Sequence, residues 1–191
     1  SIEALKQANQ QGVDVIVTDH HEPTFPYAEA LACINPKLGT YSDLTILCGA
    51  GVAFKLVHAL LKQGRNEDRK EADQVDLREG LDLVALATVA DMVPLIKENR
   101  ILVDNGLKQM KQTVWKGLSA LIQLVGDKSA VTSSVCGFQL GPRINAAGRM
   151  GSPMKAFDLL MMDNLEVSRK QASILDQLNR DRRNLEKRVY D

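Results

Sequence analysis

Apolar and polar residues follow one another along the first part of the chain in the order typical of an α/β protein. Residues 2–11 carry apolar side chains at helical spacing, and Gly12 is expected to end this helix. The run Val13–Thr18 is apolar without clean alternation, which predicts a strand covered on both faces in a parallel sheet. A second short strand is expected over residues 31–35, where Pro36 stops it.

The remaining pattern is mostly helical. Apolar spacing predicts helices over about residues 49–63, 74–90, 97–112 and 116–125, with Gly64 ending the first of them. We expect a short strand within residues 133–142, a short helix that begins near Pro153, and one long helix over the last 26 residues. The predicted fold class is α/β, with a parallel sheet flanked by helices, then a helical region and the long closing helix.

Composition is that of an ordinary globular protein. Apolar residues make up 45% of the 191 residues, charged residues 25%, and the net charge is zero. A neutral chain has no overall field that would attract nucleic acid or membrane, so any anion-binding surface must be local. Three scattered cysteines indicate a reducing compartment rather than a disulfide framework, and no stretch is apolar for long enough to span a bilayer.

One carboxylate and two imidazoles, Asp19, His20 and His21, directly follow the first predicted strand. In an open parallel sheet, ligands gather at the carboxyl ends of the strands. Imidazole and carboxylate together suit Mn²⁺, Fe²⁺, Co²⁺ or Zn²⁺. Because successive strand residues face opposite ways, we expect one histidine to bind a metal and the other to point toward the substrate. The alternative is that these histidines are ordinary core residues with hydrogen-bond partners.

Asp91 is the only charged residue between Asp82 and Lys97, and it follows an apolar helix just before Pro94. The helix dipole disfavours an anion at this end, and burial of an unpaired carboxylate is costly. We therefore expect a cation nearby, and a metal ion shared with His20 would fill that role. The alternative is an exposed aspartate at the end of a helix.

The segment GPRINAAGRM joins arginines to small residues. From Gln139 to Lys155 the only charged residues are Arg143, Arg149 and Lys155 itself. Glycines, alanines and Asn145 let backbone amides approach a ligand closely. Guanidinium groups with free amides bind phosphate well, so this segment is a candidate phosphate site. The alternative is a solvated loop. The glycines of CGAGVAFK are expected to serve helix packing rather than anion binding.

Three motifs together resemble one family. DVIVTDHHEP, ATVADMVPL and GPRINAAGRM occur in this order and at similar spacing in the DHH phosphoesterase superfamily, and the last motif makes the chain most similar to the RecJ-type exonucleases. The similarity covers nearly the whole chain. It implies an enzyme of DNA repair and recombination that hydrolyses single-stranded DNA from the 5′ end. It also implies Mn²⁺ or Mg²⁺ as cofactor, with two ions in the complete enzyme.

The resemblance also implies a role for each matching residue. His20 would bind a metal directly, and Asp19 would orient the site or reach a metal itself. His21 would contact the scissile phosphate, and Asp91 matches a later metal-binding aspartate of the family. The motif expected to hold the DNA backbone contains Arg143, Asn145 and Arg149.

Two earlier acidic motifs of the family are not in the sequence, which begins just after the expected place of the second. We therefore expect a fragment that is inactive alone. Its predicted domains are a partial DHH domain over residues 1–162 and a connector helix over residues 163–191 that leads to an absent DHHA1 domain. The cytoplasm is the expected setting, and single-stranded DNA is the expected partner.

Two alternatives remain open at this point. The chain could belong to another DHH phosphoesterase that acts on short oligonucleotides, which a preference for dinucleotides over long strands would reveal. It could also derive from a non-catalytic DHH relative that serves as a binding scaffold. Loss of metal ligands would be the mark of a scaffold, whereas Asp19, His20, His21 and Asp91 are all present.

Overall fold

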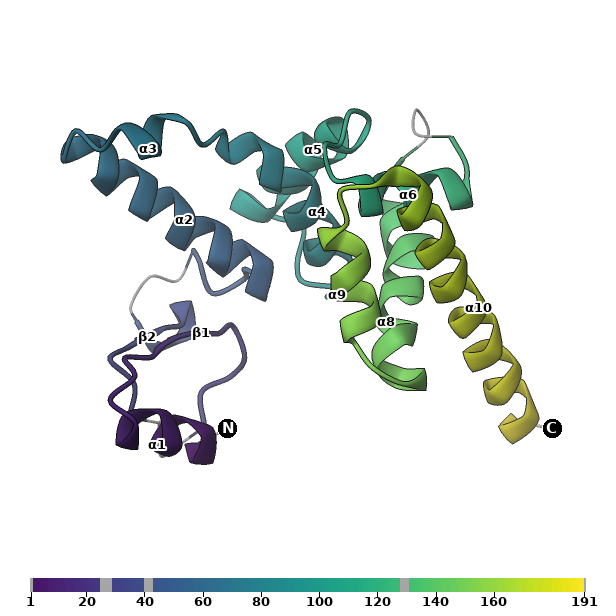
Figure 1. Cartoon of the computed structure of the whole chain (residues 1–191), viewed down its shortest axis with the longest axis horizontal. Coiled ribbons are helices and arrows are strands. Elements are labelled where there is room, and N and C mark those ends of the chain that lie inside the picture. The colour runs from purple at the N-terminus through teal and green to yellow at the C-terminus, as the bar shows by residue number, and fades with distance from the viewer. Residues whose placement is uncertain (1, 25–28, 40–42, 128–130, 191) are drawn as a thin grey trace. The chain divides into compact units, whose positions relative to one another are not determined.

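The chain forms two compact units in the computed structural model, which describes residues 2–24, 29–39, 43–127 and 131–190, with side chains described as far as Arg188 (Figure 1). Unit 1 comprises Ser1–Leu77 and Val93–Ile101, and unit 2 comprises Arg78–Met92 and Leu102–Asp191. Most of the described chain is helical, and the small parallel sheet lies in unit 1. The predicted α/β class with a following helical region is therefore confirmed.

Unit 1 begins with the predicted helix–strand–strand order. Helix α1 (Ile2–Gln10) ends just before Gly12, whose φ of 71° lies in the left-handed region that favours glycine. Strand β1 (Ile16–Thr18) pairs in parallel with β2 (Ala32–Ile34), with Val17 opposite Cys33. The short 3₁₀ helix η1 (Pro36–Leu38) follows β2. The sheet thus carries Asp19 directly beyond the carboxyl end of β1.

The prediction that the first strand is covered on both faces was wrong for this chain. Ile16 is 55% exposed and Val13 is 51% exposed, while Val15 and Val17 are half-buried. A run of β-branched residues without alternation is typical of a doubly covered strand, but burial depends on what packs against it. In the described residues, the sheet has two strands.

The main helix of unit 1 is α2 (Gly49–Asn66), which begins where the sequence predicts. Gly64 does not end it, because the helix continues for two residues and Gly64 is buried instead. A Cβ atom at Gly64 would lie 2.9 Å from that of Ala72 in the short helix α3 (Lys70–Asp73). Glycine is therefore used here for close approach of two helices. The first part of α5 (Lys97–Met110) also belongs to unit 1.

Unit 2 is built from helices. After the short 3₁₀ helix η2 (Leu77–Gly80) comes α4, and the second part of α5 leads to α6. The predicted helices near residues 97–112 and 116–125 and the one after Pro153 are confirmed, whereas the helix predicted over 74–90 begins only at Leu81. The remaining helices have these bounds: α4 (Leu81–Ala90), α6 (Lys116–Val125), α7 (Ser133–Val135), the π-helix η4 (Cys136–Leu140), α8 (Gly141–Met150), α9 (Met154–Met161) and α10 (Leu165–Tyr190).

The strand predicted within residues 133–142 was wrong. α7, η4 and α8 form one continuous helical run from Ser133 to Met150. A π-helix is a rare, wider turn that often occurs at functional sites. Cys136 and Leu140 at the two ends of η4 are completely buried in the core of unit 2. Burial of these positions at one-turn spacing accounts for the helical conformation of a segment with weak helix propensity.

The long closing helix α10 packs along α6 and α8 (Figure 1). Its buried face includes Ala172 and Leu175, together with the polar side chains Ser168, Asp176 and Asn179. The domain boundary predicted between residues 162 and 163 stays a prediction. Packing of α10 on unit 2 is compatible with the connector role expected for this helix. None of the helices in the described ranges combines the length and the apolarity needed to cross a bilayer.

Candidate active site

The triplet Asp19–His21 lies directly beyond β1 in unit 1. The Asp19 N–H donates to the carbonyl oxygen of Ile34, which continues the pairing between the two strands. The Oδ1 atom of Asp19 accepts from the backbone N–H groups of His20 at 2.7 Å and His21 at 3.2 Å. The Nδ1 atom of His21 lies 2.7 Å from the same oxygen. One carboxylate oxygen therefore organises the whole triplet.

These hydrogen bonds fix the charge of Asp19 and the orientation of His21. The pKa of Asp19 is lowered chiefly by the hydrogen bond from the His21 side chain and then by that from the His21 backbone. Because an ionised carboxylate only accepts, Nδ1 of His21 is the donor. The Nε2 atom is the remaining nitrogen of a largely exposed side chain. This is the arrangement in which a carboxylate orients an imidazole toward a metal or a phosphate.

His20 lies against the first turn of α2. A Cβ atom at Gly49 would lie 3.4 Å from Cδ2 and 3.8 Å from Nε2 of the His20 ring. The rings of His20 and His21 are 4.3 Å apart between centroids and tilted by 43°. These are ordinary contact distances, so the half-buried imidazole packs against the start of α2 without requiring a glycine there. At the neighbouring Gly51, an added Cβ atom would lie 3.2 Å from the Leu47 side chain in the turn before α2, so packing of this glycine against the sheet stays a prediction.

Asn35 is a site residue that sequence reasoning missed. Its Nδ2 atom donates to the carbonyl oxygen of His21 at 2.9 Å, and its Oδ1 atom accepts from the Lys37 N–H at 3.0 Å. The nearly buried side chain therefore ties the end of the triplet to the turn that follows β2. The available signal was an asparagine between a strand and a proline, a typical place for a side chain that caps backbone groups.

The side chains of Asp19, His20 and His21 are of the chemical types that bind metal ions, but they are too few to hold one by themselves. Imidazole nitrogens and a carboxylate suit Mn²⁺, which accepts both types of ligand. The residues that the structure describes contain no group of three His, Cys, Asp or Glu side chains arranged to hold a metal ion. One carboxylate oxygen of Asp19 is already engaged by His21, so Asp19 acts here as the group that orients the His21 ring. The triplet by itself is therefore an incomplete ligand set.

Asp91 lies in unit 2, at the C-terminal end of α4. Its N–H donates to the carbonyl oxygen of Ala87 at 2.9 Å, and its side chain is exposed. The exposed position agrees with the alternative of an aspartate at the end of a helix, so burial places no demand for a cation on this carboxylate. The next residue, Met92, has a φ of 56° and is 89% exposed. The backbone turns sharply here and leaves Asp91 at the surface.

The structure brings Asp91 close to the GPRINAAGRM motif. A Cβ atom at Gly141 would lie 3.0 Å from the Cβ of Ala90, the residue directly before Asp91. One turn earlier, a Cβ atom at Gly137 would lie 3.4 Å from the side chain of Val89. The last turn of α4 therefore lies against the helical run Ser133–Met150, and Gly141 is the glycine that this close approach requires. Motifs that are about fifty residues apart in the sequence thus meet in unit 2.

The motif itself is helix α8, not a loop, which corrects one expectation. Backbone amides inside a helix donate to carbonyl groups four residues earlier, so they are not available to a phosphate. Any contact with an anion along α8 must therefore come from side chains. Gly141 serves close packing against α4, and Pro142 follows it at the start of α8, directly after the wider turn of η4.

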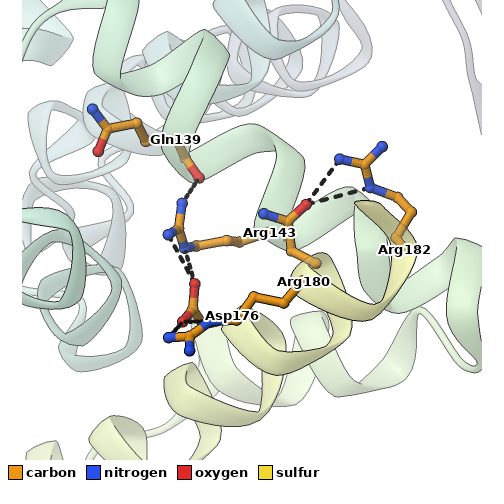
Figure 2. A network of polar contacts seen from close by, with 6 residues as sticks. Gln139, Arg143, Asp176, Arg180 and Arg182 are labelled. Atoms are coloured by element: carbon orange, nitrogen blue, oxygen red, sulfur yellow. Dashed lines mark hydrogen bonds and ion pairs between the residues drawn. The ribbon is translucent and has the colours of Figure 1, made fainter. Parts of the chain in front are cut away.

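Arg143 points toward α10 and is held there by several contacts (Figure 2). Its Nε and Nη2 atoms lie 2.8 Å from Oδ1 of Asp176, and its Nη1 donates to the Gln139 carbonyl oxygen at 2.8 Å. Arg180 binds the other oxygen of Asp176. The side chains of Arg143 and Asp176 are only 15% and 7% exposed. Arg143 thus joins α8 to α10, whatever further contact it makes.

The charge of Asp176 is set by two opposing effects. Burial acts to raise the pKa of this carboxyl group, whereas the hydrogen bond from Arg180 and the positive charges of Arg143 and Arg180 lower it further than burial raises it. The net result is a pKa below the usual range, so Asp176 stays ionised near neutral pH. It neutralises part of the positive charge that the sequence assigned to a phosphate site.

Asn145 and Arg149 lie on the other side of α8 and are exposed. Residues four apart share one face of a helix, whereas Arg143 and Asn145, two apart, point in different directions. The three residues predicted to hold DNA are therefore divided into one that contacts α10 and two that face solvent. The structure does not place Asp19, His20 and His21 relative to these residues, because the two groups belong to different units.

Comparisons with known proteins agree with the motifs. Residues 1–88 match the model of the DHH family, N-terminal domain. The chain is 39% identical over 193 residues to the single-stranded-DNA-specific exonuclease RecJ of Bacillus subtilis, covering 100% of this chain and 23% of that protein. It is 41% identical to the RecJ of Escherichia coli, covering 95% of this chain and 33% of that protein.

A solved structure has the same fold over the whole chain. The crystal structure of RecJ in complex with Mn²⁺ from Thermus thermophilus superimposes with a TM-score of 0.84 at 34% identity, covering 98% of this chain and 27% of that chain. The chain therefore spans between about a quarter and a third of the length of the relatives it matches. Its relation to the DHH phosphoesterases, inferred from three motifs, is confirmed.

Proposed function

Residues 1–88 belong to the DHH family, N-terminal domain, and from this premise we propose that the chain is part of the catalytic core of a metal-dependent exonuclease. The proposed substrate is single-stranded DNA, hydrolysed from the 5′ end. The observation that carries the proposal is the alignment of nearly the whole chain, with all three motifs, to exonucleases named as specific for single-stranded DNA. The same alignment favours this function over that of a DHH phosphoesterase acting on short oligonucleotides or of a non-catalytic scaffold.

The proposed roles follow the local geometry of each unit. In unit 1, His20 binds a metal ion and Asp19 orients His21, whose Nε2 atom faces the scissile phosphate. Support comes from the 2.7 Å contact between Asp19 and Nδ1 of His21, which leaves Nε2 as the nitrogen that Asp19 does not engage. In unit 2, Asp91 is a further metal ligand, and its exposed carboxylate at the end of α4 is compatible with that role.

The DNA backbone is proposed to contact α8. Asn145 and Arg149 are exposed on one face and can reach phosphate oxygens directly. Arg143 belongs to the same motif, and its guanidinium group is fixed in orientation by Asp176 and the Gln139 carbonyl. An arginine held in this way loses little further freedom when it contacts a phosphate, so its contribution would be one of positioning.

Mn²⁺ or Mg²⁺ is the proposed cofactor, with two ions in the complete enzyme. Solved structures of RecJ are described as complexes with Mn²⁺ and with Mg²⁺. Bound metal ions would lower the pKa of water and stabilise the oxygens that attack and leave. Imidazole donors in the triplet favour Mn²⁺ over Mg²⁺, which prefers oxygen ligands.

A role in DNA repair and recombination within the cytoplasm is also proposed. Support for a reducing setting comes from Cys33, Cys48 and Cys136, which are free cysteines in the structure. Disulfides are rare where thiols are kept reduced. The role in repair rests on the similarity to RecJ alone.

Binding measurements on the 191-residue chain test the proposal. We expect a labelled oligothymidylate to bind more tightly than a duplex of the same length, and a dinucleotide to compete poorly. Electron paramagnetic resonance of Mn²⁺ provides the second readout, with His20→Ala expected to weaken metal binding. His58→Ala is the matched control, because His58 is an exposed histidine on α2. Equal affinity for single and double strands, together with equal Mn²⁺ binding by both variants, would contradict the proposal.

A further inference from the structure

Phe138 is an exposed aromatic residue on a rigid part of unit 2. Its side chain is 82% exposed, although the residues two positions away on either side, Cys136 and Leu140, are completely buried. All three belong to the π-helix η4. The backbone that carries Phe138 is therefore anchored in the core, while its ring is presented to solvent.

Phe138 belongs to the same continuous helical run as two exposed polar residues of the proposed DNA contact. Asn145 is seven residues further along and Arg149 eleven, which correspond to nearly two and three turns of an α-helix. The wider turn of η4 shifts Phe138 by a fraction of a turn, but all three side chains are exposed. Arg143 leaves this side and contacts Asp176 instead. The run thus exposes an aromatic ring, an amide and a guanidinium group, in this order along the chain.

The stretch of sequence around Phe138 carries only positive charge, and the acidic residue nearest to it through the fold is Asp91 at the end of α4. Between Asp127 and Asp158 the sequence contains no acidic residue, and its charged residues there are Lys128, Arg143, Arg149 and Lys155. The side chain of Arg143 is paired with Asp176, while Arg149 and Lys155 are exposed. A protein segment that covered Phe138 would need to match this positive charge, whereas a nucleic-acid strand matches it with its phosphates.

We propose that Phe138 is a stacking platform for a base of single-stranded DNA whose backbone contacts Asn145 and Arg149. The inference rests on the proposed function and adds a base contact to the phosphate contacts expected from the motif. Aromatic rings bind bases of any sequence, because every base has a flat face. Stacking also requires an unpaired base, so Phe138 contributes to the preference for single strands over duplexes.

The test is the affinity of the 191-residue chain for a labelled oligothymidylate, measured by fluorescence anisotropy at several salt concentrations. Phe138→Ala is expected to weaken binding about 5- to 150-fold, as the loss of one stacked base does elsewhere. The slope of affinity against salt should not change, because no phosphate contact is lost. Arg149→Ala should instead reduce that slope by about 0.7, the value for one contact to a single strand.

The matched control is Phe157→Ala, which removes the ring of another exposed phenylalanine, 56% exposed on α9. Binding by this variant should equal that of the unaltered chain. Phe138→Trp should restore or strengthen binding, whereas Phe138→Leu keeps an apolar side chain but should not. On a strand whose bases are replaced by abasic sites, Phe138→Ala should have no effect. Thermal unfolding of each variant separates loss of binding from loss of structure.

The outcomes distinguish this inference from the proposed function. Equal affinities of the unaltered chain and Phe138→Ala for the oligothymidylate would overturn the stacking role alone. An equal loss on the abasic strand would also overturn it, because the ring would then act without bases. Failure of the unaltered chain to bind single-stranded DNA would overturn the proposed function and, with it, this inference.

Discussion

Asp82 is a completely buried carboxylate in unit 2 that has no place in the candidate site. The Thr113 hydroxyl donates to its Oδ2 at 2.5 Å, and the Leu83 N–H donates to its Oδ1 at 2.7 Å. Burial raises the pKa of Asp82 because loss of water disfavours the charged form, and these hydrogen bonds only partly oppose the shift. The folded protein therefore holds a proton on Asp82 more firmly than the unfolded chain does.

The raised pKa predicts that Asp82 makes stability depend on pH. Between the ordinary pKa of an unfolded aspartate, about 3.9, and the raised value in the fold, the native state binds more protons than the unfolded state. The free energy of unfolding must then fall as pH rises through this interval and level off above it. Urea unfolding across this range, compared with Asp82→Asn, measures the effect.

The variant Asp82→Asn lacks the ionisable group. It is therefore the reference with which the unaltered chain is compared at every pH. The stability of the unaltered chain minus that of Asp82→Asn should decrease as pH rises. Thr113→Val should cost about 1–3 kcal/mol near neutral pH, because it leaves a buried carboxylate oxygen without its donor. A difference between the two proteins that stays constant or increases with pH would contradict the raised pKa.

The site residues show how far sequence reasoning reaches for single side chains. The contact between Asp19 and His21 is local, so the cluster could be predicted from adjacent residues. The partner of Arg143 could not, because Asp176 is 33 residues away on a helix whose polar residues all look solvated in the sequence. The sequence specifies which chemical groups are present, but the packing of α8 against α10 decides which of them face a ligand.

Secondary-structure prediction from the sequence fails in the helical run Ser133–Met150, again because packing decides the outcome. Its β-branched residues and glycines predicted a strand and then a loop, whereas the structure has one continuous helix. Gly137 and Gly141 are unfavourable for a helix in isolation, but Gly141 lets the end of α4 approach closely. Tertiary contact thus overrides local propensity at the very motif that carries the function. Strongly periodic segments such as α10 were predictable because their pattern needed no partner.

The packing of α6 against α9 depends on Gly117 in the same way. A Cβ atom at this position would lie 1.8 Å from the carbonyl oxygen of Leu159, far inside contact distance. Gly117→Ala should therefore force the two helices apart and cost at least about 2 kcal/mol of stability. Urea unfolding of the 191-residue chain, followed by circular dichroism, measures this loss.

Gly148 provides the matched control for this prediction. A Cβ atom there would lie 3.7 Å from that of Pro153, an ordinary contact distance, within helix α8. Gly148→Ala should raise stability by about 0.5–1 kcal/mol, because alanine is the better helix former. If both alanine variants changed stability by similar amounts, close approach at Gly117 would not be the cause.

The whole molecule divides its apolar burial unequally between the two units. In the described residues of unit 1, the buried apolar side chains are Leu47, Cys48, Val52 and Ala72. The large core cluster, which includes Leu118, Leu121, Leu159 and Leu175, lies entirely in unit 2. Because apolar burial is the main source of stability, the segment that carries Asp19–His21 rests on the weaker core.

Hydrogen exchange should therefore differ between the units. Backbone amides of β1 and β2 are expected to exchange through low-energy local opening, whereas those of α6, which contains six buried residues, should approach the protection set by global unfolding. Exchange measured by mass spectrometry on the 191-residue chain tests this order. Gly117→Ala should speed exchange in α6 far more than in the two strands.

Equal protection of β1–β2 and α6 in the unaltered chain would mean that the small sheet is as stable as the helical core. The triplet would then be held by contacts that burial of apolar side chains does not explain.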